Sequence, residues 1–255
     1  STINGNSETN VSWNFKGAGS TTSNTNGTIT STVSANPTAG FSIVTWTGVG
    51  DVGSRTVGHG LNSAPEWIII KNTGAGNNWA VGTNYTHTTL PWKYKMKLNG
   101  SDARAESGAY FADTAPTSSV FTVEGNADVN DSGRTIVAYC FAPVKGYSAA
   151  GYYQGNGNSN GAFVYTGFRP RFLLVKKRAS GNWILFDSKR DPFNNMYHRL
   201  EANSSGSEYT GADYWNFFSN GFKAVNSDTD WNENGEQFVY LAIGQSMVGT
   251  NDIPN

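Results

Sequence analysis

Short apolar segments alternate with polar turns along most of the chain. Within many segments every second residue is apolar, and Asn-Gly pairs stand between several of them. A period of two is typical of β-strands, and Asn-Gly suits tight hairpins because both residues tolerate positive φ. The pattern predicts strands at Phe41–Thr47, Glu66–Asn72, Trp79–Gly82, Trp92–Leu98, Ser119–Val123, Thr135–Ala142, Ser148–Gln154, Ala162–Tyr165, Arg171–Lys177, Trp183–Asp187, Met196–Glu201, Phe222–Val225 and Gln237–Ile243.

The strand pattern is written twice, in residues 40–145 and again in residues 146–247. Aligned residues lie roughly one hundred positions apart, which is a domain-sized period and too long for a solenoid repeat. Part of a third copy, similar to the closing strand, occupies residues 3–16. The matching segments are Gly60–Lys71 with Gly167–Lys176, Asn78–Val81 with Asn182–Leu185, and Asn130–Ala142 with Asn232–Gly244.

The expected fold class is all-β, with two tandem homologous antiparallel β-sandwich domains of jelly-roll-like type. The first repeat spans residues 38–145, and the second spans residues 146–255 with a short C-terminal tail. Residues 1–37 are expected to hold the end strand of an upstream repeat and a Gly/Ser/Thr/Asn-rich linker or strand. The alternation in Gly27–Ser34 favours a strand there, and a disordered linker is the alternative.

Composition and charge narrow the range of partners. The 255 residues carry a net charge of −1, and Lys/Arg balance Asp/Glu within each repeat. The sequence therefore has no basic field to attract nucleic acid or an anionic membrane. It also has no apolar run near the roughly 18 residues that a membrane-spanning helix needs. We expect neither nucleic-acid binding nor membrane insertion.

The reactive side chains form no pattern that marks a catalytic centre or a cofactor site. The single cysteine, Cys140, lies in an apolar strand and corresponds to Ala242 in the second copy, which indicates a core residue. The three histidines, His59, His87 and His198, lack metal-binding spacing and are expected to make structural hydrogen bonds. We expect no enzymatic activity and no cofactor.

The acidic residues closest to a paired arrangement are Asp187 and Asp191, with Arg190 between them. A glycosidase needs two carboxyl groups on opposite sides of one bond, and their separation is not fixed by sequence. A local ion-pair and turn-capping network explains the three residues better.

Two loops are similar to the opening of a calcium-binding loop, D-x-N-x-N-G. A full EF-hand loop needs an acidic residue at its twelfth position, where this chain has Leu241 and Tyr139. An ordinary hairpin rich in Asn, Asp and Gly explains the same residues, so we expect no metal site. The positions of this weak resemblance are Asp230, Asn232 and Asn234 in one loop and Asp128, Asn130 and Ser132 in the other.

Eight tryptophans invite a test for carbohydrate stacking. Trp79 and Trp183 share one repeat position, and Trp67 is replaced by Phe172, so these aromatic residues are expected to fill the sandwich interiors. Aromatic residues near loops are less constrained by the repeat. They form a speculative glycan-binding patch of Trp215, Trp231, Tyr209 and Tyr214.

A further set of motifs covers the chain from about residue 9: Thr28–Asn36, Gly40–Gly48, Val57–Leu61, Ala64–Asn72, Ala138–Ala142, Tyr165–Pro170 and Asp187–Pro192. Together they resemble a repeat domain of tail and fibre proteins in marine tailed bacteriophages, cyanophages among them. The resemblance implies a structural protein of the virion. It carries no known catalytic motif, so it implies no active-site residues.

The expected function is therefore a non-catalytic segment of a phage tail fibre or related appendage, serving assembly and host-surface attachment on the extracellular particle. Expected partners are other virion subunits, further copies of the chain in a homo-oligomer (trimers are usual in fibres) and host surface glycan. A carbohydrate-binding, lectin-like module is the alternative. A polysaccharide depolymerase is a third class, which requires two carboxylates facing each other in one cleft.

Overall fold

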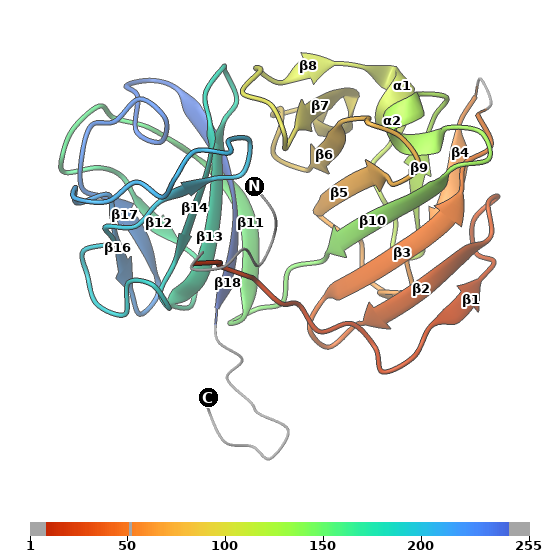
Figure 1. Ribbon diagram of the computed structural model, residues 1–255, viewed down its shortest axis with the longest axis horizontal. Coiled ribbons are helices and arrows are strands. Elements are labelled where there is room, and N and C mark those ends of the chain that lie inside the picture. The colour runs from red at the N-terminus through yellow and green to blue at the C-terminus, as the bar shows by residue number, and fades with distance from the viewer. Residues whose placement is uncertain (1–8, 51–52, 245–255) are drawn as a thin grey trace.

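The computed structural model describes residues 9–50 and 53–244, and its fold is all-β, built from antiparallel sheets. Two halves lie side by side (Figure 1), an N-terminal half of residues 9–145 and a C-terminal half of residues 146–244. Each half is a β-sandwich of one large and one small sheet. No helix in the described part is long and apolar enough to cross a membrane.

The large sheet of the N-terminal half has the strand order β1-β2-β3-β10-β5-β6-β7-β8, and β4 pairs with β9 in the small sheet. Three short helices lie between strands. The bounds are β1 Thr22–Asn24, β2 Ser31–Asn36, β3 Phe41–Thr47, β4 Arg55–Gly58, β5 Trp67–Asn72, β6 Trp79–Thr83, the 3-10 helix Pro91–Lys93, β7 Tyr94–Lys97, β8 Ala105–Glu106, α1 Gly108–Phe111, β9 Val120–Val123, α2 Ala127–Asn130 and β10 Thr135–Phe141.

The large sheet of the C-terminal half has the order β11-β18-β13-β14-β15, and its small sheet has the order β12-β17-β16. The bounds are β11 Ser148–Gln154, β12 Phe163–Tyr165, β13 Pro170–Lys177, β14 Trp183–Asp187, β15 Leu200–Glu201, β16 Trp215–Phe218, β17 Gly221–Ala224 and β18 Gln237–Gly244.

The two halves share one strand arrangement. The order β3-β10-β5-β6-β7 matches β11-β18-β13-β14-β15, and the pair β4-β9 matches β12-β17. Equivalent strands begin at equivalent repeat residues, as Trp79 begins β6 and Trp183 begins β14. The sequence repeat is thus visible as the same order of pairing in both halves.

Most strands form close to the bounds that the apolar pattern predicts. The pattern does not predict β4 or β16, and Met196–Glu201 forms only β15 and two isolated bridges, at Met196 and Arg199. In the Gly/Ser/Thr/Asn-rich segment, β1 and β2 extend the large sheet, with β2 paired to β3. Residues 9–16 form no strand, and the rest of the expected upstream strand lies outside the described residues, as does the C-terminal tail.

Each sandwich is filled by the inner faces of its own two sheets. In the N-terminal half, large-sheet residues such as Val44 pack with Phe121 of the small sheet. In the C-terminal half, residues such as Leu173 pack with Phe222.

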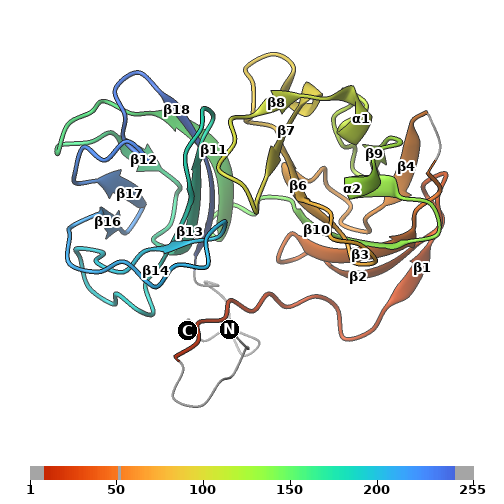
Figure 2. The same cartoon turned by 45° about the horizontal axis from the view of Figure 1, so that its top comes forward.

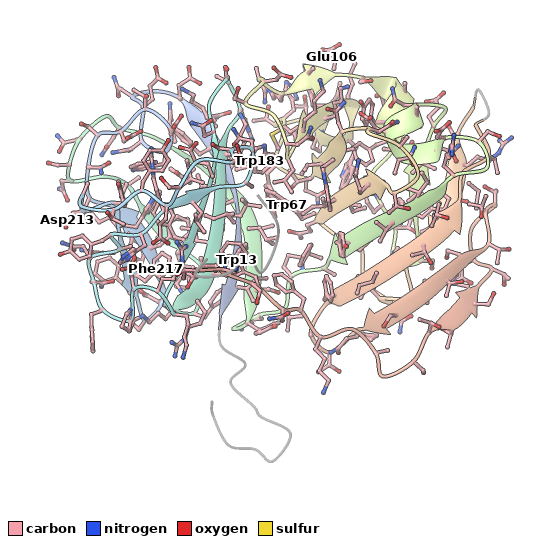
Figure 3. All side chains as sticks on the ribbon, in the orientation of Figure 1. Trp13, Trp67, Glu106, Trp183, Asp213 and Phe217 are labelled. Atoms are coloured by element: carbon pink, nitrogen blue, oxygen red, sulfur yellow. The ribbon has the colours of Figure 1, made fainter. Side chains whose placement is uncertain are left out.

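A third apolar cluster, which we call the junction core, fills the contact between the outer faces of the two large sheets. Trp67 and Trp183 meet there edge to face with ring centroids 6.1 Å apart (Figure 3). The Trp183 Nε1–H donates a hydrogen bond to the Lys97 carbonyl at 2.7 Å. The buried members are Phe41, Trp67, Val81, Met96, Phe141, Leu174, Trp183, Leu185, Val239, Leu241 and Ile243.

The N-terminal segment packs across the same contact. The Phe15 ring centroid lies 5.4 Å from that of Phe41 in one half and 6.0 Å from that of Phe172 in the other. The Trp13 Nε1–H donates to Asp187 Oδ2 at 3.2 Å. Residues 9–16 therefore contact both halves.

The expectation that the recurring aromatic residues fill the sandwich interiors is wrong. Trp67 and Trp183 point away from their own sandwiches into the junction core, and Phe172 packs against it. Trp79, on the equivalent face of β6, is half-buried and stacks on Tyr139. A continuous apolar run such as that in β5 fits a strand buried on both faces, by the sandwich on one side and by the other half on the other.

Replacing Trp183 with alanine should lower the free energy of unfolding by about 3–5 kcal/mol, because a fully buried ring is lost from a packed contact. Trp79→Ala is the matched control, since it removes the same side chain from the equivalent but half-buried position, and it should cost less than half as much. Urea unfolding of both variants measures the difference. Equal losses would mean that the junction core contributes nothing beyond local strand packing.

Lys176 is a buried cation on the junction side of β13. Its ammonium donates to the carbonyl of Lys177, the last residue of β13, at 2.7 Å and to that of Ala179, in the loop before β14, at 2.9 Å. Burial first, and then the charge of Lys177, lower the pKa of Lys176 from 10.5 to about 8. Between these two pH values the unfolded chain binds a proton that the folded chain has released, so stability rises with pH.

The free energy of unfolding should therefore gain about 1 kcal/mol from Lys176 between about pH 7 and about pH 9. Lys176→Met removes this gain. Urea unfolding of both proteins at the two pH values isolates it, because the contributions of other titrating groups cancel in the comparison. The same pH dependence in both proteins would show that Lys176 stays protonated in the fold.

Candidate binding surface

A chain of one aspartate and two asparagines braces the loops of the N-terminal half. Asp128 Oδ1 accepts the backbone N–H of Asn78 at 2.9 Å, and its Oδ2 accepts the side-chain amide of Asn78 at 3.2 Å. Asn99 donates to Asn78 Oδ1 at 3.2 Å and accepts the backbone N–H of Trp79 at 2.9 Å. The side chains thus replace backbone pairing at the start of β6.

The same chain recurs in the C-terminal half. Asp230 accepts the backbone N–H of Asn182 at 3.3 Å and its side-chain amide at 3.2 Å. Asn203 donates to Asn182 at 2.9 Å and accepts the N–H of Trp183 at 2.7 Å. The recurring Asp and Asn residues therefore hold loops in place.

Asn130 and Asn232 of the calcium-like loops have matching structural roles. Asn130 Oδ1 accepts the N–H of Val49 at 3.0 Å, and Asn232 Oδ1 accepts the N–H of Asn156 at 3.0 Å. The described residues contain no group of three His, Cys, Asp or Glu side chains placed to hold a metal ion. The expectation of ordinary hairpins is wrong. Asp128 and Asn130 lie in the short helix α2, and both segments connect strands of different sheets, β9 to β10 and β17 to β18.

Three of the four speculative glycan-binding residues are buried, so the exposed patch expected there is wrong. Trp215 and Trp231 are fully buried, and Tyr214 is buried as well. Trp215 lies in β16, which the sequence pattern does not predict, and that strand turns its ring into the sandwich core. Tyr209 remains exposed at 43%, with the Arg199 guanidinium 4.2 Å from its ring centroid.

The Asp187 network is close to the one that the sequence predicts. Asp187 Oδ1 accepts the backbone N–H groups of Lys189 and Arg190 at 3.0 Å each, and its Oδ2 pairs with Arg190 Nε at 2.7 Å. Asp191 turns instead to His198, whose Nδ1 lies 2.6 Å from Asp191 Oδ1. Both aspartates therefore stabilise the loop after β14, and Asp187 also accepts the hydrogen bond from Trp13.

His59, His87 and Cys140, the other reactive residues considered in the sequence, also have structural roles. His59 is buried, with Nε2 3.1 Å from the Thr117 carbonyl, and burial lowers its pKa. His87 Nδ1 accepts backbone N–H groups from its own loop. Cys140 is buried in the core of the N-terminal half, and burial raises the pKa of its thiol to about 12. The expectation of a core cysteine is confirmed.

The small sheet of the C-terminal half carries an exposed aromatic surface, which we call the aromatic face and define as Phe163, Tyr165 and Phe218. Their exposed fractions are 48%, 69% and 39%. The Phe163 and Phe218 ring centroids are 5.8 Å apart. The three strands lie on the side of the molecule away from the N-terminal half (Figures 1 and 2).

Strand geometry explains why these rings face solvent. In β12 the middle residue, Val164, points into the core, so its neighbours Phe163 and Tyr165 point outward. Gly221 on β17 makes room for the Phe163 ring, because a Cβ there would lie 2.7 Å from that ring. Phe193, which is 80% exposed, adjoins Asn194, whose amide pairs with both backbone groups of Phe217 beside Phe218.

The N-terminal half covers the equivalent face. Thr56 and Gly58 of β4 stand where β12 has Phe163 and Tyr165. Thr28 and Thr56 exchange hydrogen bonds, and a Cβ at Gly58 would lie 2.0 Å from the Asn24 side chain. Small residues are required there, whereas the C-terminal half leaves the face open and fills it with aromatic rings. A comparison of the two copies at these positions could have identified the aromatic face from the sequence.

Asp128→Ala should lower the free energy of unfolding by about 1–3 kcal/mol, because it leaves the Asn78 N–H groups without an acceptor. Asp230→Ala is the matched change in the other half and should act in the same direction. Added calcium should leave the melting temperature of the wild-type protein unchanged. A saturable calcium-dependent rise that both variants abolish would establish a metal site instead.

No curated protein and no solved structure matches the chain. One family model does match, over residues 1–246, and this span includes both halves and the junction core. The family is therefore defined over the pair of sandwiches and not over one of them. The chain belongs to this family, whose description is a domain of unknown function, DUF7483.

Proposed function

We propose that the chain is a non-catalytic attachment module, made of two homologous jelly-roll-like β-sandwich domains in tandem within a phage tail fibre or related appendage. The equal strand order of the two halves supports the duplication. The motifs that resemble tail and fibre proteins of marine phages support the setting in a virion. Other virion subunits and further copies of the chain are its proposed partners.

The aromatic face is the observation that carries the attachment role. Exposed contiguous aromatic side chains on a soluble protein mark interaction sites, and sugar rings stack on such surfaces. Lys223, paired with Phe163 across β12 and β17, donates to Asn160 at the same surface, which adds polar groups for sugar hydroxyls. In the N-terminal half the matching strand β4 pairs with β9 without aromatic rings at the positions of Phe163 and Tyr165, so this strand pairing does not require them.

Weak contacts suffice for this role. A single shallow face binds a sugar with low affinity, but an appendage presents several copies to one host surface, and linked sites raise the overall affinity without new contacts. The junction core supports this use, because it fixes the two halves to each other and holds the aromatic face at one end of the pair.

We expect Phe163→Ala and Tyr165→Ala to weaken binding to the host-surface glycan by about tenfold or more, because each removes a stacking surface. Stability should change by no more than about 0.5 kcal/mol, since both side chains are exposed. A glycan array followed by titration of the best ligand measures the binding. Leu90→Ala, which removes an exposed apolar side chain of the N-terminal half, is the control.

Failure of the wild-type protein to bind any host glycan would contradict the attachment role. Equal weakening by Leu90→Ala would contradict the assignment to the aromatic face. The proposal that the chain is part of a virion is tested separately, by gold labelling of phage particles with antibodies against this chain. Labelling at the tail or its fibres is expected, and unlabelled particles would exclude that setting.

A further inference from the structure

A cavity lies at the junction, apart from the aromatic face. It has a volume of about 350 Å³ and is lined by Ala103 and Arg104 from the N-terminal half and by Arg178, Ala179, Gly235, Glu236 and Gln237 from the C-terminal half. The segment between β7 and β8 reaches the C-terminal half there (Figure 2), where the Arg104 N–H donates to the Arg178 carbonyl at 2.9 Å. We call the cavity between Arg104 and Arg178 the junction cavity.

Arg178 is a buried cation that forms no ion pair with a carboxylate of the described residues. The residue is 4% exposed, its Nε donates to the Tyr85 carbonyl at 2.7 Å, and its Nη1 donates to the side-chain carbonyl of Gln237. Its guanidinium lies 4.7 Å from the Tyr152 ring centroid. The third nitrogen, Nη2, is buried and has no hydrogen-bond partner in the described part of the chain.

Two partly buried arginines of the C-terminal half have the carboxylate partners that Arg178 lacks. Arg190 pairs with Asp187 and Glu208, and Arg199 pairs with Glu201 and Asp228. Removing a charge from water is strongly unfavourable unless an opposite charge compensates it. By that rule, the Arg178 site lacks a negatively charged partner among the described residues.

Arg104 adds a second cation to the same cavity. Its guanidinium donates to the Thr86 carbonyl and lies 5.0 Å from the Tyr94 ring centroid, and no described carboxylate is within ion-pair distance. Burial first, and then the charge of Arg104, lower the pKa of Arg178 to about 10. Glu236 lines the cavity but forms no ion pair with either arginine.

We propose that the junction cavity binds an oxyanion, held between the guanidinium groups of Arg104 and Arg178. Carboxylate, sulfate and phosphate groups all match the planar donor fork of arginine. Such a ligand offsets the like-charge repulsion and gives the Arg178 guanidinium the opposite charge that it lacks among the described residues. Because the two arginines come from different halves, the bound oxyanion also ties the halves together. The proposal does not depend on the aromatic face.

The test is calorimetric titration of the full chain at constant ionic strength with sulfate, phosphate, glucuronic acid and neutral glucose. Saturable one-to-one binding of the anions and not of glucose is expected. Arg104→Met and Arg178→Met should each weaken binding by about tenfold or more. Arg134→Met, which removes an exposed arginine paired with Asp131, is the matched control and should bind as the wild type does.

The comparison of anions identifies the source of the ligand. Tighter binding of glucuronic acid than of inorganic sulfate or phosphate points to an acidic glycan, and the reverse order points to a free ion. Arg104 is partly exposed, so Arg104→Met should remain folded even where Arg178→Met does not, and circular dichroism checks this. The proposal is wrong if the wild-type protein binds none of the anions saturably.

Glu236→Gln distinguishes the proposal from the main alternative, in which Glu236 is the counter-ion of the two arginines. An oxyanion site predicts that this variant binds the anion at least as tightly as the wild type, because a negative charge leaves the cavity wall. If instead the variant is destabilised and the wild-type protein binds no anion, Glu236 itself neutralises the arginines, and the proposal fails.

Discussion

The apolar contact between the outer faces of the two large sheets determines how this chain is organised. An antiparallel sheet in a sandwich usually leaves its outer face to water, but here Trp67 and Trp183 bury those faces against each other. The two sandwiches therefore behave as one unit, which agrees with a family model that spans both. The contact also brings Arg104 beside Arg178 and leaves the aromatic face at a free end.

The sequence could predict the strands of the large sheets but not the direction in which their side chains point. An apolar run such as Trp67–Ile70 identifies a buried strand, and the repeat identifies its counterpart. Neither reveals that the outer face is covered by the other half. Trp79 and Trp183 hold equivalent positions, yet one is half-buried and the other fully buried, because burial here depends on a contact between the repeats and not within them.

The position of the exposed aromatic residues was misjudged from the sequence for a related reason. Trp215 and Trp231 stand among Asn, Asp and Gly residues, which suggests loops, but β16 and the core enclose both rings. Phe163 and Tyr165 stand in a predicted strand, which suggests a core, but they lie on its outer side. Local composition indicates whether a segment turns or extends, whereas exposure depends on which segment covers it, as Thr28 covers Thr56 in the other half.

The duplication offers a better guide to function than residue type does. Where two halves have the same strand order, residues that recur in both halves stabilise the structure that the halves have in common. Asp128 and Asp230 do so by bracing equivalent loops. Residues that occur in only one copy are not needed for this common structure. Arg178 stands at the β13 end where the N-terminal half has Thr73, and both make the same backbone hydrogen bond to the closing strand. The backbone needs no arginine there, so its buried guanidinium calls for a reason beyond the fold.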